Sequence, residues 1–358
     1  MKHLAKKIVF MAGLLTCVIF LSCPEEAPMA AISSDGTFKL SDGVKALEYR
    51  VVNIHVYSIS GRYLMSITPE PVYEEEEEEN EDGDDGGTGG NISLPSIPNA
   101  NKKVLYYNWK LETDLPQGEL VTFWVELLDV NTGVVYYAEG KDDIIVSGTR
   151  YDWVLEEIFI PVFNEEDLRK LGNDEHFLPS KNYALIADLD LKEPWEPLCT
   201  GSYAFSGLFD GKGHTISGLR FNTAAHSNIG FFSYLRGTSG KHAVVKNLNI
   251  VMHGGNLNLE AGTRSFGGLA GYAEFADIEK VMIKSMSSSS IEPIIIHKLG
   301  GTEFDLGGIV GNFSMSGSIT KSASQIPMSA SLNSTGGPVT VFIGGIVGRA
   351  GDPNTGEQ

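Results

Sequence analysis

Apolar and polar residues alternate over short runs along the first half of the chain, as they do in β-strands that bury one face. Turn sequences such as Leu115–Gly118 and Asp129–Gly133 separate the runs. We therefore expect an antiparallel β-sandwich over residues 41–158, with a hairpin turn at Gly61. The expected strands are residues 51–58, 62–67, 104–111, 120–127, 133–137, 144–146 and 153–155.

Aromatic residues are concentrated in these expected strands. Neighbouring residues of a strand point to opposite faces, so about half of the rings should enter the core. We expect sandwich core and edge cover, and the alternative is a platform on which carbohydrate stacks. The residues concerned are Tyr106, Tyr107, Trp109, Phe123, Trp124, Tyr136, Tyr137 and Trp153.

The second half of the chain repeats a glycine-rich cluster. It occurs at residues 229–233, 266–271, 306–311 and 343–348, and the steps from Gly230 to Gly268, Gly308 and Gly345 are 38, 40 and 37 residues. A nearly constant period in a strand-rich sequence indicates stacked structural units. Each unit would bury its apolar face only by packing on the next unit.

These clusters resemble the GLUG motif of bacterial surface proteins. The run Phe-Ser-Gly-Leu-Phe-Asp-Gly-Lys-Gly-His-Thr-Ile, residues 205–216, is similar to the lead-in of the same proteins. A related region occurs in the non-catalytic part of some IgA-specific metallopeptidases. The resemblance covers roughly residues 160–350 and implies a right-handed parallel β-helix. The expected fold is thus all-β, with an N-terminal antiparallel β-sandwich followed by GLUG-like β-helix repeats over residues 159–358.

The repeat glycines are expected to be structural. Glycine allows positive φ at corners and close approach of neighbouring coils, and Asp-Gly and Lys-Gly pairs are typical of turns. The residues assigned to this role are Gly207, Asp210, Gly211, Gly213, Gly230, Gly267, Gly268, Gly271, Gly307, Gly308, Gly311, Gly344, Gly345 and Gly348.

The N-terminus has the pattern of an export signal. A cationic start is followed by an apolar run over residues 8–21, which is shorter than the ~20 residues of a membrane-spanning helix. The run ends in Phe20-Leu21-Ser22-Cys23, which resembles a lipobox. We expect a lipoprotein signal peptide at residues 1–22, lipid on Cys23 and a tether at residues 23–40. Cys17 is a rival lipidation site, and an ordinary secretory signal is the alternative interpretation.

Charge is concentrated in one segment. The net charge is −19, and Glu74–Asp85 alone holds ten carboxylates and no base. We expect a disordered acidic insertion at residues 74–92. Calcium binding by Asp82, Asp84 and Asp85 is the alternative, although their spacing does not match an EF-hand. Nucleic acid is excluded as a partner, since that would need clustered Lys and Arg.

No pattern in the sequence indicates catalysis. The chain has no His-Glu-x-x-His, nucleophile elbow or P-loop, and ionisable residues do not recur at matching offsets in the repeats. Asp188 and Asp190 are expected at a strand end, His214 in a turn, and Cys199 as a buried inert thiol. We expect no enzyme activity, no catalytic or metal-ligating residues and no cofactor.

The expected function is that of a lipid-anchored, adhesin-like or structural display module on the cell surface or outer membrane of a bacterium. Its partners would be the membrane, through the N-terminal lipid, and a surface protein or glycan of a host or neighbouring cell. Two alternatives stay open. One is a carbohydrate-active β-helix enzyme, a lyase or hydrolase, and the other is an inactive, truncated member of a larger surface protein family.

Overall fold

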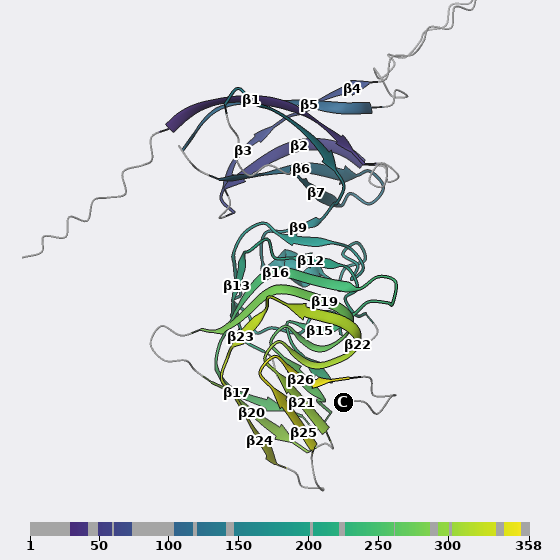
Figure 1. Ribbon diagram of the computed structural model, residues 1–358, viewed down its shortest axis with the longest axis vertical. Helices are drawn as coiled ribbons and strands as arrows, with labels where there is room; N and C mark the ends of the chain where they lie inside the picture. Colours follow the sequence, from purple (N-terminus) through teal and green to yellow (C-terminus); the bar gives the residue numbers. More distant parts are fainter. Residues whose placement is uncertain are drawn as a thin grey trace, which may run out of the picture.

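The computed structural model describes residues 29–41, 49–58, 61–73, 104–116, 120–140, 147–200, 203–221, 226–260, 262–286, 293–300, 303–333 and 340–351. Nearly all of these residues lie in strands or the turns between them. A β-sandwich is stacked on one end of a parallel β-solenoid, along the long axis of the molecule (Figure 1). The expected all-β fold, sandwich first and solenoid second, is confirmed.

The sandwich consists of two four-stranded sheets, with strand orders β4-β5-β1-β8 and β3-β2-β6-β7. Aromatic and aliphatic side chains from both sheets fill the space between them. The Trp109 and Trp153 rings stack there with their centroids 5.0 Å apart. The strands are β1 (Met29–Leu40), β2 (Tyr49–Ser58), β3 (Tyr63–Ile67), β4 (Glu70–Tyr73), β5 (Val104–Pro116), β6 (Val121–Asp129), β7 (Val135–Glu139) and β8 (Arg150–Leu155).

The structure differs from the sequence expectation at the N-terminal boundary of this unit. The segment 29–40, expected as part of a tether, forms β1, which pairs antiparallel with β5 and parallel with β8. The sandwich is therefore not purely antiparallel. Residues 33–37 in the middle of β1 include no apolar side chain, so the strand shows no continuous alternation. Phe38 is nevertheless buried, and Gly36 lies so close to Tyr151 that an added Cβ would be 1.8 Å from its carbonyl oxygen. Pairing with distant strands, rather than local pattern, creates this strand.

Other expectations for the sandwich are confirmed. A hairpin joins β2 to β3 at Gly61, and a turn at residues 129–133 joins β6 to β7. Six of the eight aromatic residues are buried, which agrees with the core interpretation; Tyr107 is partly buried and Tyr106 is 37% exposed. The signal peptide, Cys23, the acidic insertion at residues 74–92 and the expected strand at residues 144–146 lie outside the described residues.

The solenoid has three faces, each a sheet of parallel strands. The long face has the order β26-β22-β19-β16-β12-β10-β9, and β14-β18-β21-β25 and β17-β20-β24 form the other two. Its only described helix, α2 (Glu165–Lys170), begins after Asn164, whose side chain accepts a hydrogen bond from Asp167 N. The strands are β9 (Ile160–Val162), β10 (Tyr183–Leu185), β11 (Leu189–Asp190), β12 (Leu208–Asp210), β13 (Thr215–Leu219), β14 (Asn228–Ile229), β15 (Phe232–Arg236), β16 (Ala243–Met252), β17 (Gly255–Leu259), β18 (Ser265–Gly267), β19 (Ala270–Ser285), β20 (Ile294–Leu299), β21 (Glu303–Gly307), β22 (Val310–Thr320), β23 (Ala323–Gln325), β24 (Met328–Asn333), β25 (Thr340–Gly344) and β26 (Val347–Ala350).

Each glycine cluster forms the corner between the β14-β18-β21-β25 face and the long face. An added Cβ on the first glycine of the pair would strike the strand that follows in the same coil: Gly307 would meet Val310 O at 1.9 Å. On the second glycine it would strike the next coil, since Gly308 would meet Gly345 O at 2.1 Å. The glycines are thus required by close backbone packing. Gly345 differs, because no atom lies within 4 Å of its Cβ position.

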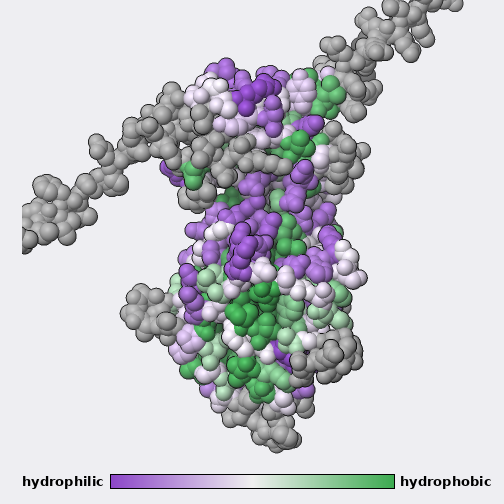
Figure 2. Space-filling view, in the orientation of Figure 1, coloured by the Kyte–Doolittle hydropathy of each residue, from purple (hydrophilic) through white to green (hydrophobic). Residues whose placement is uncertain are grey.

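The sandwich and solenoid meet through a buried aromatic cluster. The outer face of the β3-β2-β6-β7 sheet packs against the first coils through Tyr57, Trp124, Tyr137, Phe159, Ala184 and Ile186. Tyr137 and Phe159 also exchange two backbone hydrogen bonds of 2.7 and 2.8 Å. The surface around this joint is largely hydrophilic, whereas apolar residues gather over the coils at the far end (Figure 2). The described coil at that end exposes 62% of Ile343 and 37% of Ile346.

Lys212 forms polar contacts across this joint. Its Nζ forms an ion pair with Glu139 of the sandwich and lies 3.4 Å from the Asp210 carboxylate. The same Nζ lies 5.2 Å from the ring centroid of Trp124 and 5.0 Å from the ring centroid of Phe159. Burial alone would lower the pKa of Lys212, but the two carboxylates outweigh it and raise that pKa. The lysine is therefore held charged between the two units.

Alanine substitutions at Gly308 and Gly345 test whether a repeat glycine is needed for close packing or only recurs in the sequence. We expect Gly308→Ala to lower the free energy of unfolding by about 3 kcal/mol, because the Cβ would displace the next coil. Gly345→Ala is the matched control and should change it by less than about 0.5 kcal/mol. Urea unfolding followed by circular dichroism measures both, and equal losses would contradict the packing argument.

Removing the joint cation should also destabilise the protein. Lys212→Met keeps most of the side-chain length but leaves Glu139 and Asp210 without it, so we expect a loss of about 1–2 kcal/mol in a partly exposed pair. Lys192→Met removes an exposed ion pair with Asp190 and should cost less than about 0.5 kcal/mol. Thermal unfolding compares the variants; a double-mutant cycle with Glu139→Gln that shows no coupling would refute the role of Lys212.

Candidate functional site

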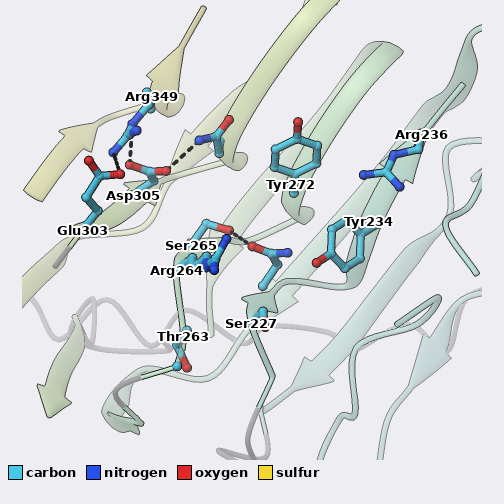
Figure 3. Close-up of a pocket in the computed structure, with 13 residues that line it drawn as sticks. Ser227, Tyr234, Arg236, Thr263, Arg264, Ser265, Tyr272, Glu303, Asp305 and Arg349 are labelled. Atoms are coloured by element: carbon cyan, nitrogen blue, oxygen red, sulfur yellow. Dashed lines mark hydrogen bonds and ion pairs between the residues drawn. The ribbon is translucent and has the colours of Figure 1, made fainter. Parts of the chain in front are cut away.

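A cleft of about 780 Å³ runs across successive coils on the outer side of the glycine corners. We call it the glycine-corner cleft. One wall comes from β14, β18 and β21 with the loop before β18, and the other from β15, β19, β22 and β26 (Figure 3). It is lined by Ser227, Asn228, Tyr234, Arg236, Gly262, Thr263, Arg264, Ser265, Tyr272, Glu303, Asp305, Asn312 and Arg349.

The strand register places equivalent residues of successive coils in two ladders. Asn228 pairs with Ser265, and Ser265 with Asp305, on the first wall. On the second wall the ladder is Tyr234, Tyr272, Asn312 and Arg349, each paired with the next. Parallel strands in register repeat a side-chain position once per coil, so the two ladders face one another along the cleft.

Glycines let these two walls meet. An added Cβ on Gly271 would lie 2.6 Å from the Asn228 Cβ, and one on Gly348 would lie 2.6 Å from Leu306 N. Both contacts reach from the second wall to the first wall of the preceding coil. The glycines identified as structural therefore also shape the cleft, because larger residues there would force the walls apart.

An ion-paired network forms one end of the cleft. Arg349 Nε donates to Asp305 Oδ1 at 2.9 Å, and Arg349 Nη2 donates to Glu303 Oε2 at 3.0 Å. Asn312 Nδ2 donates to Asp305 Oδ2 at 2.7 Å. Burial raises the pKa of Asp305, although the hydrogen bond from Asn312 and the charge of Arg349 oppose this. The Asp305 carboxylate is thus fixed in orientation by partners on both oxygens (Figure 3).

The other end is aromatic. The rings of Tyr234 and Tyr272 lie in adjacent coils with centroids 5.8 Å apart, and Arg236 lies 5.5 and 5.9 Å from them. Glu274 pairs with Arg236 at 2.6 Å and accepts a hydrogen bond from the Tyr272 hydroxyl at 2.9 Å. Burial raises the pKa of Tyr272. Both rings are only partly buried, so they contribute surface to the cleft.

The floor between these ends is polar and ordered. Ser265 Oγ donates to Asn228 Oδ1 at 2.6 Å, and both side chains are buried. Arg264, beside them, is exposed and has no ion pair within 4 Å among the described residues. The cleft therefore offers fixed donors and acceptors together with the Arg264 guanidinium, which no described carboxylate neutralises.

A second polar group contains residues of catalytic type. On the outer face of the sandwich, His55 Nδ1 lies 2.7 Å from Ser66 Oγ, and its Nε2 contacts Glu126. Acyl transfer also needs a substrate cavity and donors for the oxyanion. Neither the glycine-corner cleft nor the two cavities at the joint include Ser66. We interpret the group as a cross-strand polar network.

The remaining residues singled out in the sequence are structural. Asp210 is 2% exposed, accepts hydrogen bonds from Lys212 N and Asn247, and precedes the turn at positive φ that Lys212 and Gly213 form. His214 is buried beside Asp188, at 3.3 Å. Cys199 is buried, as expected, and burial raises the pKa of its thiol to about 12. No cluster of three or more His, Cys, Asp or Glu with metal-site geometry occurs among the described residues.

The cleft residues were not identified from the sequence, although one signal marks them. Tyr272, Asn312 and Arg349 each stand four positions after the second glycine of a corner, and Tyr234 stands four after Gly230. Their residue types differ, so no single motif appears. Their shared distance of four positions from a corner glycine is the signal that groups these four residues.

Comparison with known proteins gives limited relationships. No family model matches the chain. A protein of Evansella cellulosilytica described as a "Putative Gly-rich membrane protein" is 29% identical over 142 residues, which is 38% of this chain and 16% of that protein. The crystal structure of a "putative immunoglobulin A1 protease" from Bacteroides ovatus matches with 17% identity and a TM-score of 0.23, over 53% of this chain and 84% of the other. This chain therefore matches only a small part of the length of the first protein.

The state of Cys199 can be tested directly. With its pKa near 12 and almost no exposure, the thiol should react with a disulfide reagent at pH 8 at least about a hundredfold more slowly in the folded protein than in 6 M guanidinium. Absorbance of the released thiolate measures the rate in a chain that carries Cys17→Ala and Cys23→Ala, where Cys199 is the remaining thiol. Reaction at the unfolded rate would show that the thiol is accessible and that the packing around it is wrong.

Proposed function

We propose that the protein is an exported bacterial lipoprotein, anchored through Cys23, that displays a GLUG-like solenoid as a non-catalytic, adhesin-like binding module. The observation that carries this proposal is the glycine-corner cleft, where side chains from successive coils converge in fixed orientations. Groups held in place before a ligand arrives lose little entropy on binding, which favours recognition. The partner would be a surface protein or glycan of a host or neighbouring cell.

The arrangement of charges favours binding over catalysis. Both carboxylates that line the cleft, Asp305 and Glu303, are bonded to the same Arg349. Glycoside hydrolysis needs two carboxyl groups acting from opposite sides of the scissile bond. Among the side chains that line the cleft, a shifted pKa is found for Asp305 and Tyr272.

A carbohydrate-active enzyme is the second candidate. The raised pKa of Asp305, in a cleft that also holds Tyr272, is the observation that favours it, because a general acid needs a carboxyl that retains its proton. Release of reducing ends or unsaturated sugars from polysaccharides, abolished by Asp305→Asn, would establish this alternative. The absence of products after prolonged incubation at high enzyme concentration would favour the binding module.

The anchor proposed at the N-terminus is consistent with the sequence pattern around Cys23. No helix among the described residues is long and apolar enough to cross a membrane. A diacylglycerol on Cys23 would supply two acyl chains, and two lipid chains hold a protein stably at a bilayer.

Metabolic labelling with a fatty-acid probe tests the anchor. We expect the wild type and Cys17→Ala to incorporate label and to sediment with membranes, and Cys23→Ala to incorporate at least about tenfold less and to appear in the soluble fraction. Cys17→Ala is the matched control, since this cysteine lies inside the apolar run. Equal labelling of all three chains would exclude Cys23 as the attachment site, and complete protection from external protease on intact cells would exclude surface display.

A further inference from the structure

We propose that the glycine-corner cleft binds an extended oligosaccharide that lies along the solenoid axis, with sugar rings against Tyr234 and Tyr272 and hydroxyl groups on Asn312, Asp305 and Arg349. The inference rests on the proposed role as a binding module and names the ligand class of its site. It does not depend on the lipid anchor. Three features of the cleft lead to it.

The first feature is the repeat of the binding groups. The second wall presents one side chain per coil, from Tyr234 through Tyr272 and Asn312 to Arg349, and adjacent strands are spaced by about 4.8 Å. A ladder of this kind matches a ligand that is itself a linear repeat. The cavity of about 780 Å³ is within the range of small-molecule sites and has room for more than one sugar ring.

The second feature is the pairing of aromatic surface with fixed polar groups. A sugar ring has apolar C–H faces and a rim of hydroxyls, each of which both donates and accepts hydrogen bonds. Tyr234 and Tyr272 supply the aromatic surface, and the Tyr234 hydroxyl makes no hydrogen bond to a described residue. Asp305 accepts and Arg349 donates, and their mutual bonds hold both groups in place.

The third feature is the charge. Arg349 is paired with Asp305 and Glu303, and Arg236 with Glu274, so these guanidinium groups are locally neutralised. A polyanion such as nucleic acid would meet these carboxylates along the cleft. Arg264 has no ion pair to any residue that the structure describes, and a single carboxylate on a sugar would suit it. The cleft therefore fits neutral sugars, with acidic substituents accepted at one point.

Affinity electrophoresis and titration calorimetry test the proposal on the full chain carrying Cys23→Ala, which separates sugar binding from anchoring. The probes are two neutral polysaccharides, mannan and laminarin, and two that contain uronic acids, alginate and polygalacturonate. We expect at least one of the four to bind. Tyr234→Ala and Tyr272→Ala should each weaken that binding about tenfold, a loss of 1.4 kcal/mol.

Two further variants sharpen the test. Tyr203→Ala removes a tyrosine that is 69% exposed and outside the cleft, and it should bind like the parent. Arg264→Gln should weaken binding of uronic-acid polymers severalfold and leave neutral polymers unchanged, which distinguishes the two sugar sources. Thermal unfolding within about 3 °C of the parent shows that a variant is folded.

The outcomes separate the two proposals. Binding that is lost in the tyrosine variants supports the oligosaccharide site even if lipid labelling fails. Binding that is equal in Tyr203→Ala, Tyr234→Ala and Tyr272→Ala, or the absence of binding to all four polymers, overturns the ligand assignment. The proposed lipid-anchored display module would then be tested only by the labelling experiment on Cys23.

Discussion

The close approach of backbones at the glycine corners is the constraint on which the rest of the solenoid depends. Apart from Gly345, the corner glycines lie in close contact with their own coil, the next coil or the preceding coil. A side chain at any of these contacts would push apart layers whose parallel pairing buries the core. The same contacts bring two strand walls together on the outside, so one set of glycines both stacks the coils and shapes the cleft.

The different roles of the sandwich and the solenoid follow from how the two units pack together. The sandwich covers the first coils with the outer face of one sheet, and Trp124 and Tyr137 are buried by the neighbouring unit and not by their own core. Lys212 adds an ion pair across the joint. The cleft lies farther along the solenoid and contains no residue of the sandwich. The sandwich therefore supports and caps the solenoid, while the cleft depends on the coils alone.

The architecture could be predicted from the sequence because both units repeat a pattern. Alternation predicted the sandwich, and the period of the glycine clusters predicted the stacked coils. The strand β1 could not be predicted, because residues 33–37 in its middle break the alternation of apolar and polar residues and the segment owes its conformation to β5 and β8. The cleft could not be predicted, because Tyr234, Asn312 and Arg349 match no motif individually and come together only through the strand register. Lys212 was placed in a turn, and no local pattern could reveal its partner Glu139, 73 positions away.

The position of β1 has a mechanical consequence. Since the strand begins at Met29, only a few residues separate it from Cys23, and a chain of that length spans roughly 20 Å at most. A molecule attached to a bilayer at Cys23 would be joined to it by this short segment, so its sandwich would lie near the lipid headgroups. The coils that form the cleft lie toward the opposite end of the long axis (Figure 1). A protein anchored in this way would hold its cleft at a set distance from the membrane, and that distance would limit how closely two surfaces could approach.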